Sequence, residues 1–383
     1  MRKQIFTMSV LASMTFASLT NAQDAAAIKT DEFKPSGKVT GQFFGDYFMK
    51  MHADSAARGS SQYSGKANPK NYNTFAIRRI YLGYDYQMSE QFSTQVLFAN
   101  ENDNADASGQ RTVYIKAANI KWKNFIKNND LILGQTATPF FALSSDGIWG
   151  YRSVEKSVAD MRGFCGSNDL GIMVQGKLND KGDYGYNFMV GNGTGQKPET
   201  NKYKKGYGEV FAKFLDQKLI IDLAGTYEQN SIAAKKATST SKLTIAYQTK
   251  QVTVGAEAVM QTQTNAATDT TNGKKNANQV NVTPFAFSVF VRGQIIENKL
   301  QYFARYDSYN PNTTFDANSK YSTAMNTNKE GFATVGLDWT PVKNAHIMPN
   351  IWYDGFTSMK NNQKSLAKSD YDLTARLTVF YKF

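Results

Sequence analysis

The chain ends in the stretch Tyr371-Asp372-Leu373-Thr374-Ala375-Arg376-Leu377-Thr378-Val379-Phe380-Tyr381-Lys382-Phe383, in which apolar and polar side chains alternate. Successive side chains of a β-strand point to opposite faces, so a strand here places every second residue from Leu373 to Phe383 on one face. That face is apolar, whereas the other face carries Asp372, Thr374 and Arg376. The stretch therefore predicts a strand with one apolar and one polar face.

Sixteen segments, this stretch included, show a similar alternation over roughly ten residues. They are 37–51, 73–87, 92–101, 110–124, 130–137, 169–178, 183–192, 206–215, 218–229, 240–249, 251–263, 282–295, 299–309, 329–341, 345–357 and 369–383. Short connections between them alternate with long ones, and the long ones are 52–72, 102–109, 138–168, 193–205, 230–239, 264–281, 310–328 and 358–368. This alternation is typical of a barrel with tight periplasmic turns and longer external loops. We predict an all-β fold, a single transmembrane antiparallel β-barrel of about 16 strands.

Composition supports this fold class. The 383-residue chain is 41% hydrophobic with a mean hydropathy of −0.48, which excludes a helical bundle built from apolar spans of ~20 residues. Its 21 Tyr, 25 Phe and 28 Gly suit strands and tight turns. A soluble β-sandwich is the alternative, but it gives no reason for the connections to alternate in length.

The first residues predict export. Arg2 and Lys3 precede an apolar stretch, and Thr20-Asn21-Ala22 resembles a signal cleavage site, so we expect a signal peptide over 1–22. A short N-terminal segment, 23–36, would then precede the barrel domain, 37–383. An N-terminal membrane anchor is the alternative, but the stretch is too short and too polar to span a bilayer. The segment 23–36 also leaves too little chain for the plug domain of a gated receptor.

The net charge of +12 is strongly basic. Such an excess suits nucleic acid, an anionic lipid surface or a pore that favours anions. Because the chain is expected to be exported, nucleic acid is the least expected of these three partners. Cys165 is the one cysteine, so no disulfide can form within the chain, and we assign this residue no function.

The connection 138–168 is the longest and carries the most apolar residues. Structureless loops of this length are uncommon unless they are functional, so we expect this loop to fold into the barrel and narrow it. It would then bring six charged residues into the lumen: Asp146, Arg152, Glu155, Lys156, Asp160 and Arg162. The alternative is an external loop that covers the mouth.

Strand alternation places a set of basic side chains on the polar inner face, namely Arg78, Arg292, Arg305 and Arg376, and less surely Lys116 and Lys213. Arg78 and Arg79 are adjacent, so one faces the lumen and the other reaches a membrane interface, unless a bulge intervenes. We expect Arg78 inside. A basic wall attracts anions, although a solvated face with no selective role is an equal alternative.

Aromatic side chains near strand ends are predicted to lie at the two membrane interfaces. They are Tyr81, Tyr84, Tyr86, Trp122, Tyr306, Tyr309, Trp339, Trp352 and Tyr353.

Several short motifs resemble the phosphate-selective porin O and P family. They are Phe75-Ala76-Ile77-Arg78-Arg79-Ile80-Tyr81-Leu82-Gly83-Tyr84, Gly134-Gln135 with Pro139-Phe140, Arg152-Ser153-Val154, Arg305-Tyr306-Asp307 and Gly336-Leu337-Asp338-Trp339-Thr340-Pro341. The resemblance implies a sixteen-stranded, trimeric outer-membrane porin whose third external loop lines the constriction. It also implies that Phe383 is the C-terminal aromatic residue that the outer-membrane assembly machinery recognises. The phosphate-selective members of that family have a ladder of basic residues along the solute path. In this chain acidic residues lie between the basic ones, so strict phosphate selectivity is not expected.

An enzyme is not expected. A catalytic triad needs a histidine beside its nucleophile, and His52 and His346 fall at opposite ends of the predicted barrel without a serine motif. The sequence indicates no structural zinc site and no phosphate-cradling loop, so we expect no cofactor and no metal. Glu101, Asp103 and Asp106 could bind Ca²⁺, although a solvated polar loop is the commoner reading.

The sequence therefore predicts a porin of the bacterial outer membrane that allows passive diffusion of small hydrophilic solutes. We expect a weak to moderate anion preference, with phosphate as one candidate solute. The expected partners are outer-membrane lipid, these solutes and two further copies in a homotrimer. The alternative is a surface adhesion or binding protein that works through the loops 52–72, 264–281 and 310–328.

Overall fold

The computed structural model describes residues 33–58, 69–101, 104–321, 326–360 and 369–383. The predicted signal peptide and most of segment 23–36 lie outside these residues. The barrel belongs to one compact unit, Pro35–Phe383. In the described ranges no helix has the length and apolar character needed to cross a membrane.

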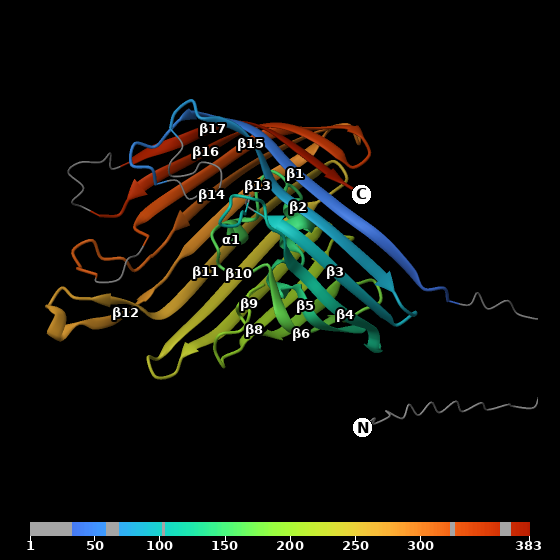
Figure 1. Cartoon of the computed structure of the whole chain (residues 1–383), viewed down its shortest axis with the longest axis horizontal. Coiled ribbons are helices and arrows are strands. Elements are labelled where there is room, and N and C mark those ends of the chain that lie inside the picture. The colour runs from blue at the N-terminus through green and yellow to red at the C-terminus, as the bar shows by residue number, and fades with distance from the viewer. Residues whose placement is uncertain (1–32, 59–68, 102–103, 322–325, 361–368) are drawn as a thin grey trace, which may run out of the picture. The chain divides into compact units, whose positions relative to one another are not determined.

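Strands make up most of this unit (Figure 1). They are β1 (Ser36–His52), β2 (Asn73–Gln87), β3 (Phe92–Glu101), β4 (Tyr114–Ile126), β5 (Asn129–Ala137), β6 (Asn168–Lys177), β7 (Tyr184–Gly191), β8 (Lys205–Phe214), β9 (Leu219–Ser231), β10 (Lys236–Gln248), β11 (Val252–Asp269), β12 (Asn278–Val282), β13 (Phe285–Ile296), β14 (Leu300–Asn310), β15 (Asn328–Val342), β16 (Ala345–Ser358) and β17 (Ser369–Lys382). The helices are short: η1 (Pro139–Phe141), η2 (Ser144–Trp149), α1 (Val158–Met161) and η3 (Lys274–Asn276).

The strands form one closed antiparallel sheet. Apart from β12 and β13, each strand pairs with its neighbours along the chain, and β1 pairs with both β2 and β17, which closes the barrel. β12 and β13 both pair with β11, so they are two parts of a single barrel strand that is interrupted at Thr283 and Pro284. The prediction of a 16-strand antiparallel barrel is therefore confirmed.

Side chains alternate across the wall as the sequence predicted. In β17, Leu377 and Val379 are exposed on the outer face, whereas Asp372 and Arg376 are buried inside. A closed barrel pairs its backbone groups internally and can present such an apolar outer face to lipid. The barrel is therefore a membrane-spanning one.

Two predicted external loops are strand instead. The ladder between β9 and β10 continues to Ser231 and Lys236, and β11 pairs with β12 as far as Asp269 and Asn278. The segments 230–239 and 264–281 are therefore largely hairpin extensions, and β12 lies near the left edge of Figure 1. The sequence did not indicate these strand extensions, because they are rich in Thr, Ser and Asn. A strand outside the membrane has no lipid-facing side, so its side chains need not alternate between apolar and polar.

The inner face is less polar than predicted. Tyr81 and Trp352, predicted at membrane interfaces, are buried inside the barrel, as are Phe48, Phe303 and Phe332. Tyr84, Trp122, Tyr306, Trp339 and Tyr353 are exposed on the outside, as expected of interface residues. Phe48, Phe303, Phe332 and Trp352 pack against the connection between β5 and β6.

Candidate functional site

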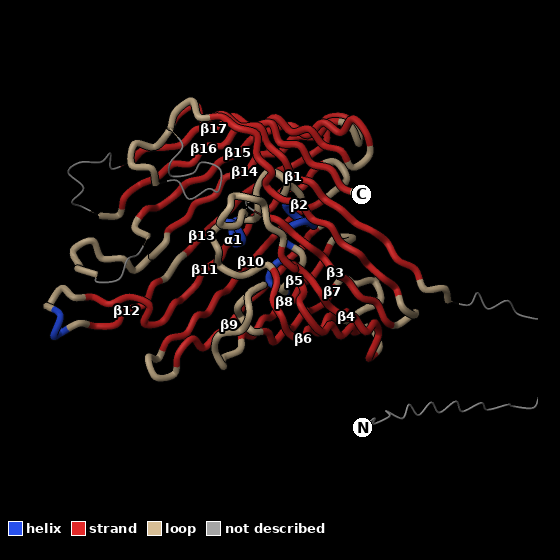
Figure 2. The backbone as a smooth tube through the Cα atoms, viewed as in Figure 1, coloured by secondary structure: helices blue, strands red, loops and turns tan. Residues whose placement is uncertain are grey.

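The connection between β5 and β6, residues 138–167, is called the inner loop below. Its base is closed, because the Thr138 N–H donates to the Ser167 carbonyl at 3.0 Å and the Thr138 hydroxyl donates to the Gly166 carbonyl at 2.8 Å. Its short helices lie in the middle of the ring of strands (Figure 2). Gly150 turns the loop with a φ of 74°, and a Cβ there would lie 3.1 Å from the Arg292 guanidinium.

Apolar side chains fix the inner loop to the inner wall. Phe140, Ile148, Trp149 and Val154 are each 1% exposed or less. The ring centroids of Trp149 and Phe290 lie 5.3 Å apart, and those of Tyr151 and Phe303 lie 4.4 Å apart. Burial of this area stabilises the docked loop by the hydrophobic effect and by close packing.

Glu155 docks the tip of the inner loop on β2. Its carboxylate lies 3.7 Å from the Arg78 guanidinium and 4.0 Å from the Arg79 guanidinium. Arg78 also donates to the Ser153 carbonyl at 2.7 Å, and Arg79 donates to the Arg152 carbonyl at 2.9 Å. The two arginines therefore bind both the charge and the backbone of the loop.

Both arginines point into the barrel, as the alternative with a bulge predicted, and Arg79 does not reach a membrane interface. Phe44 pairs with Arg79 and Gly45 pairs with Ile77, which leaves Arg78 as the extra residue of a β-bulge. A bulge lets two successive side chains share one face.

The charge of Glu155 is stabilised by its position. Burial alone would raise the pKa of Glu155, but Arg78 and Arg79 outweigh burial and hold this pKa below its usual range. The carboxylate is therefore ionised at neutral pH.

The opposite side of the inner loop docks on β10–β15. Arg162 of the loop forms an ion pair with Glu330. Wall side chains donate to loop carbonyls: Arg292 to Ile148 at 3.1 Å, Gln261 to Phe164 at 2.9 Å, Arg305 to Lys156 and Lys242 to Phe140. Glu257 accepts from the Ala159 N–H at 3.1 Å. The loop is thus held by polar contacts from several strands.

A less buried group of charges lies where the inner loop meets β2–β4. We call it the loop–wall cluster, and it consists of Glu101, Lys116, Arg152, Lys156 and Asp160. Arg152 lies 3.5 Å from Glu101 and donates to the Tyr81 hydroxyl at 3.0 Å. Lys116 lies 3.1 Å from Glu101, and Lys156 lies 3.6 Å from Asp160. The Arg152 and Lys156 side chains are 14% and 13% exposed, so these cations are partly exposed to solvent.

The structure divides the predicted site residues into three groups. Arg152, Lys156 and Asp160 come together in the loop–wall cluster. The buried ones, which hold the loop or the wall around it, are Arg78, Glu155, Arg162, Arg305 and Arg376, and Arg292 is half-buried with its guanidinium on the loop backbone. The side chain of Asp146 lies outside the described part of the chain.

Sequence reasoning missed Arg79, Lys242 and Asp46 as functional residues. Asp46 lies 3.3 Å from Arg78 and also pairs with Arg376. The adjacent arginines were a visible signal, but the bulge that directs both inward depends on the pairing with β1.

Glu101 was one of the three residues of the calcium alternative, together with Asp103 and Asp106. It accepts from Tyr114 at 2.7 Å and pairs with Lys116 and Arg152, so cations of the chain itself occupy its surroundings. Asp106 accepts hydrogen bonds from its own loop, and Asp103 lies outside the described residues. The described residues contain no group of three or more His, Cys, Asp or Glu side chains arranged to hold a metal ion.

No family model matches the sequence, and no curated protein matches it. Solved structures match in fold. The outer membrane channel DcaP of Acinetobacter baumannii is 13% identical, covers 92% of this chain and 99% of its own, and has a TM-score of 0.65. The anion-selective porin from Comamonas acidovorans is 11% identical over 91% of this chain and 100% of its own, with a TM-score of 0.59. The trimer form of OmpT of Vibrio cholerae is 13% identical over 91% of this chain and 99% of its own, with a TM-score of 0.56.

These likenesses define the fold class, which is that of the outer-membrane porin barrels. They do not single out the phosphate-selective porin O and P family. The barrel and its apolar outer wall locate the chain in a bacterial outer membrane.

Proposed function

We propose that the chain is a passive channel for small hydrophilic solutes, in which the inner loop sets the size limit. The observation that carries this proposal is the docking of the inner loop on the inner wall of a closed barrel, through Glu155 at one side and Arg162 at the other. Diffusion through such a barrel requires no catalytic residue, cofactor or energy source.

The solute path follows the wall of β2–β5. The inner loop packs against β9–β16 and, through Phe140 and Phe141, against β5–β8, and Glu155 docks its tip on β2. The loop–wall cluster lies beside β3 and β4, which carry Glu101 and Lys116. Toward the short-turn end, a polar hollow of about 480 Å³ is lined by residues that include Asp85, Gln95, Asn119 and Lys121. A solute would pass the cluster and then this hollow.

The preference is for anions and is weak to moderate. The loop–wall cluster holds three cations against two carboxylates, namely Lys116, Arg152 and Lys156 against Glu101 and Asp160. Charges in a narrow rim with low-dielectric walls focus their field on passing ions. Phosphate is one candidate, since guanidinium groups bind it well.

The assembly is a homotrimer within outer-membrane lipid. The fold likeness to OmpT of Vibrio cholerae, whose structure is described as a trimer form, supports this proposal.

The test is the reversal potential of the reconstituted full chain in a planar bilayer under a KCl gradient. We expect the sign of a chloride preference. A cation-selective sign would refute the anion preference, and the absence of any conductance would refute the channel and favour the surface-binding alternative.

A further inference from the structure

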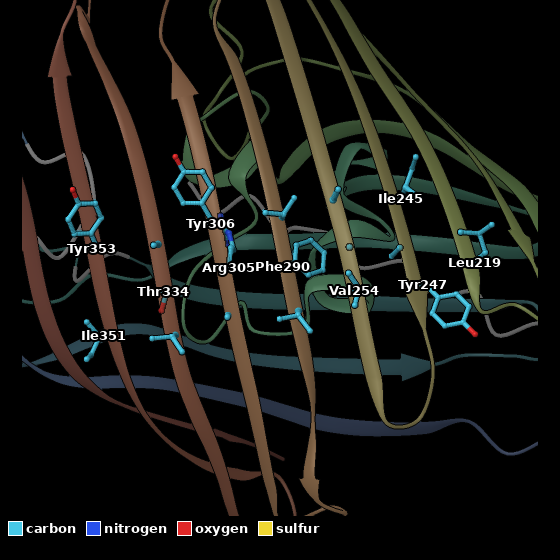
Figure 3. A pocket seen from close by; sticks show the side chains of 18 residues that line it. Leu219, Ile245, Tyr247, Val254, Phe290, Arg305, Tyr306, Thr334, Ile351 and Tyr353 are labelled. Atoms are coloured by element: carbon cyan, nitrogen blue, oxygen red, sulfur yellow. The ribbon is translucent and has the colours of Figure 1, made fainter.

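The outer wall of the barrel is hollowed where β9–β16 face the lipid (Figure 3). The hollow has a volume of about 910 Å³, and Ala256, Ala304 and Ala333 form its floor. Tyr306 and Tyr353 flank Ala333, because the three residues are in register across β14, β15 and β16. We call this hollow the outer groove.

A second hollow, of about 470 Å³, adjoins the outer groove and shares Tyr306 and Tyr353 with it. It lies toward the long connections, because it is lined by the first residues of β15 and β17 and the last residues of β16. Gly331 and Gly355 are paired in register there, and the Tyr306 and Tyr353 hydroxyls lie over them, 3.6 and 2.9 Å from where a Cβ atom would be. In Figure 3 the hydroxyls of Tyr306 and Tyr353 point toward this end. We call the second hollow the polar notch.

The polar notch carries one exposed cation, Lys329, which forms no ion pair within the described ranges. Two carboxylates lie nearby but are engaged elsewhere. Glu330 is buried and pairs with Arg162, and Asp370 accepts from the backbone N–H groups of Ser55 and Tyr371 at 2.8 and 2.9 Å. An apolar groove therefore continues into a notch with hydroxyl groups and a positive charge.

We propose that this surface binds one anionic lipid, with an acyl chain in the outer groove and the lipid phosphate at Lys329. In a bilayer an acyl chain gains nothing from leaving water, so the fit to the alanine floor and the charge of the headgroup must select the lipid. The wall of a second barrel would rest on the projecting Tyr306 and Tyr353 and would not reach Ala333. This proposal does not depend on conduction by the channel.

The test is native mass spectrometry of the detergent-purified full chain titrated with phosphatidylglycerol or phosphatidylcholine. The variants are Lys329→Gln, which removes the charge, and Ala333→Trp, which fills the groove from the lipid side. Lys236→Gln and Ala118→Trp are matched controls, because Lys236 is exposed at the same end of the barrel and Ala118 lies in β4, away from the groove. Ala304→Phe replaces Ala333→Trp if the latter fails to fold.

We expect one phosphatidylglycerol per wild-type chain, bound several-fold more tightly than phosphatidylcholine. Lys329→Gln should weaken phosphatidylglycerol about fivefold, the effect of one Lys near an anionic surface. Ala333→Trp should abolish binding, the controls should match wild type, and inorganic phosphate should not compete. Equal lipid binding by all variants would overturn the proposal, as would a change of oligomeric state in Ala333→Trp with unchanged lipid binding.

Discussion

Glu155 holds the tip of the inner loop between two guanidinium groups inside a closed barrel. Removing one partner of a buried ion pair typically costs about 3–5 kcal/mol, because the remaining charge is left uncompensated. We therefore expect Glu155→Gln to loosen the inner loop while the barrel wall stays intact. Single-channel recordings should show larger and noisier currents, and the loop should become sensitive to protease.

Glu297→Gln is the matched control, because Glu297 is exposed in the turn between β13 and β14. Quiet, wild-type currents from Glu155→Gln would show that the ion pair does not hold the loop.

Arg152 and Arg305 were both predicted to face the lumen, but they have different surroundings. Arg152 is accessible in the loop–wall cluster, whereas Arg305 is buried and bound to Asp307 and to the loop backbone. Arg152→Glu should move the reversal potential toward cations, and Lys250→Glu, at an exposed turn, should leave it nearly unchanged. Arg305→Glu should instead reduce the yield of folded barrel. If Arg152→Glu left the reversal potential unchanged, Arg152 would not line the solute path.

Cys165 lies at the base of the inner loop, among buried apolar side chains. Burial raises the pKa of the Cys165 thiol to about 11, and the thiolate is the reactive form of cysteine. We expect a thiol reagent to label the native protein very slowly at neutral pH and the denatured protein fast. Rapid labelling of the native protein would show that the loop base opens.

The contact of Glu155 with Arg78 and Arg79 should resist mild acid. The folded-state pKa of Glu155 is depressed, so its contribution to docking is full above the usual Glu pKa of about 4.3 and is lost only as the pH falls through the depressed value. Single-channel conductance should therefore stay constant from neutral pH to about 5 and become noisy only in stronger acid. If the single-channel current became noisy near pH 6, a titrating group other than Glu155 would control the docking of the inner loop.

Most elements could be predicted from alternation, because a membrane forces each strand to show lipid an apolar face. The strand ends were harder to predict. β11 runs on to Asp269 through polar residues, and β4 begins at Tyr114 because the chain before it forms a separate bridge between Ala105 and Arg111.

Only part of the candidate site could be predicted from the sequence. The length and apolar content of 138–168 marked the inner loop, but which of its charges are buried depends on partners far along the chain. Glu155 meets residues of β2 and Arg162 meets a residue of β15. The inward aromatic residues, such as Phe303 and Trp352, broke the expected polar pattern because the inner loop covers them.

In the complete barrel, the closed wall and the docked inner loop have different roles. The wall supplies the membrane-spanning structure, and in the proposed channel the loop–wall cluster would supply the charge that solutes meet. Salt screens such partly exposed charges, with a Debye length of about 10 Å at 0.1 M and about 3 Å at 1 M. The anion preference should therefore shrink as the salt concentration rises, and a preference independent of salt would place its source in buried charges.

The size limit set by the inner loop can be measured as single-channel conductance of the full chain and of a variant without this loop. Thr138 and Ser167 are already hydrogen-bonded at 3.0 Å, so a short Gly-Ser turn can replace residues 139–166 without opening the barrel. We expect a several-fold larger conductance and passage of larger solutes in a variant that still migrates as a folded barrel. An unchanged conductance in that folded variant would show that the inner loop does not set the size limit.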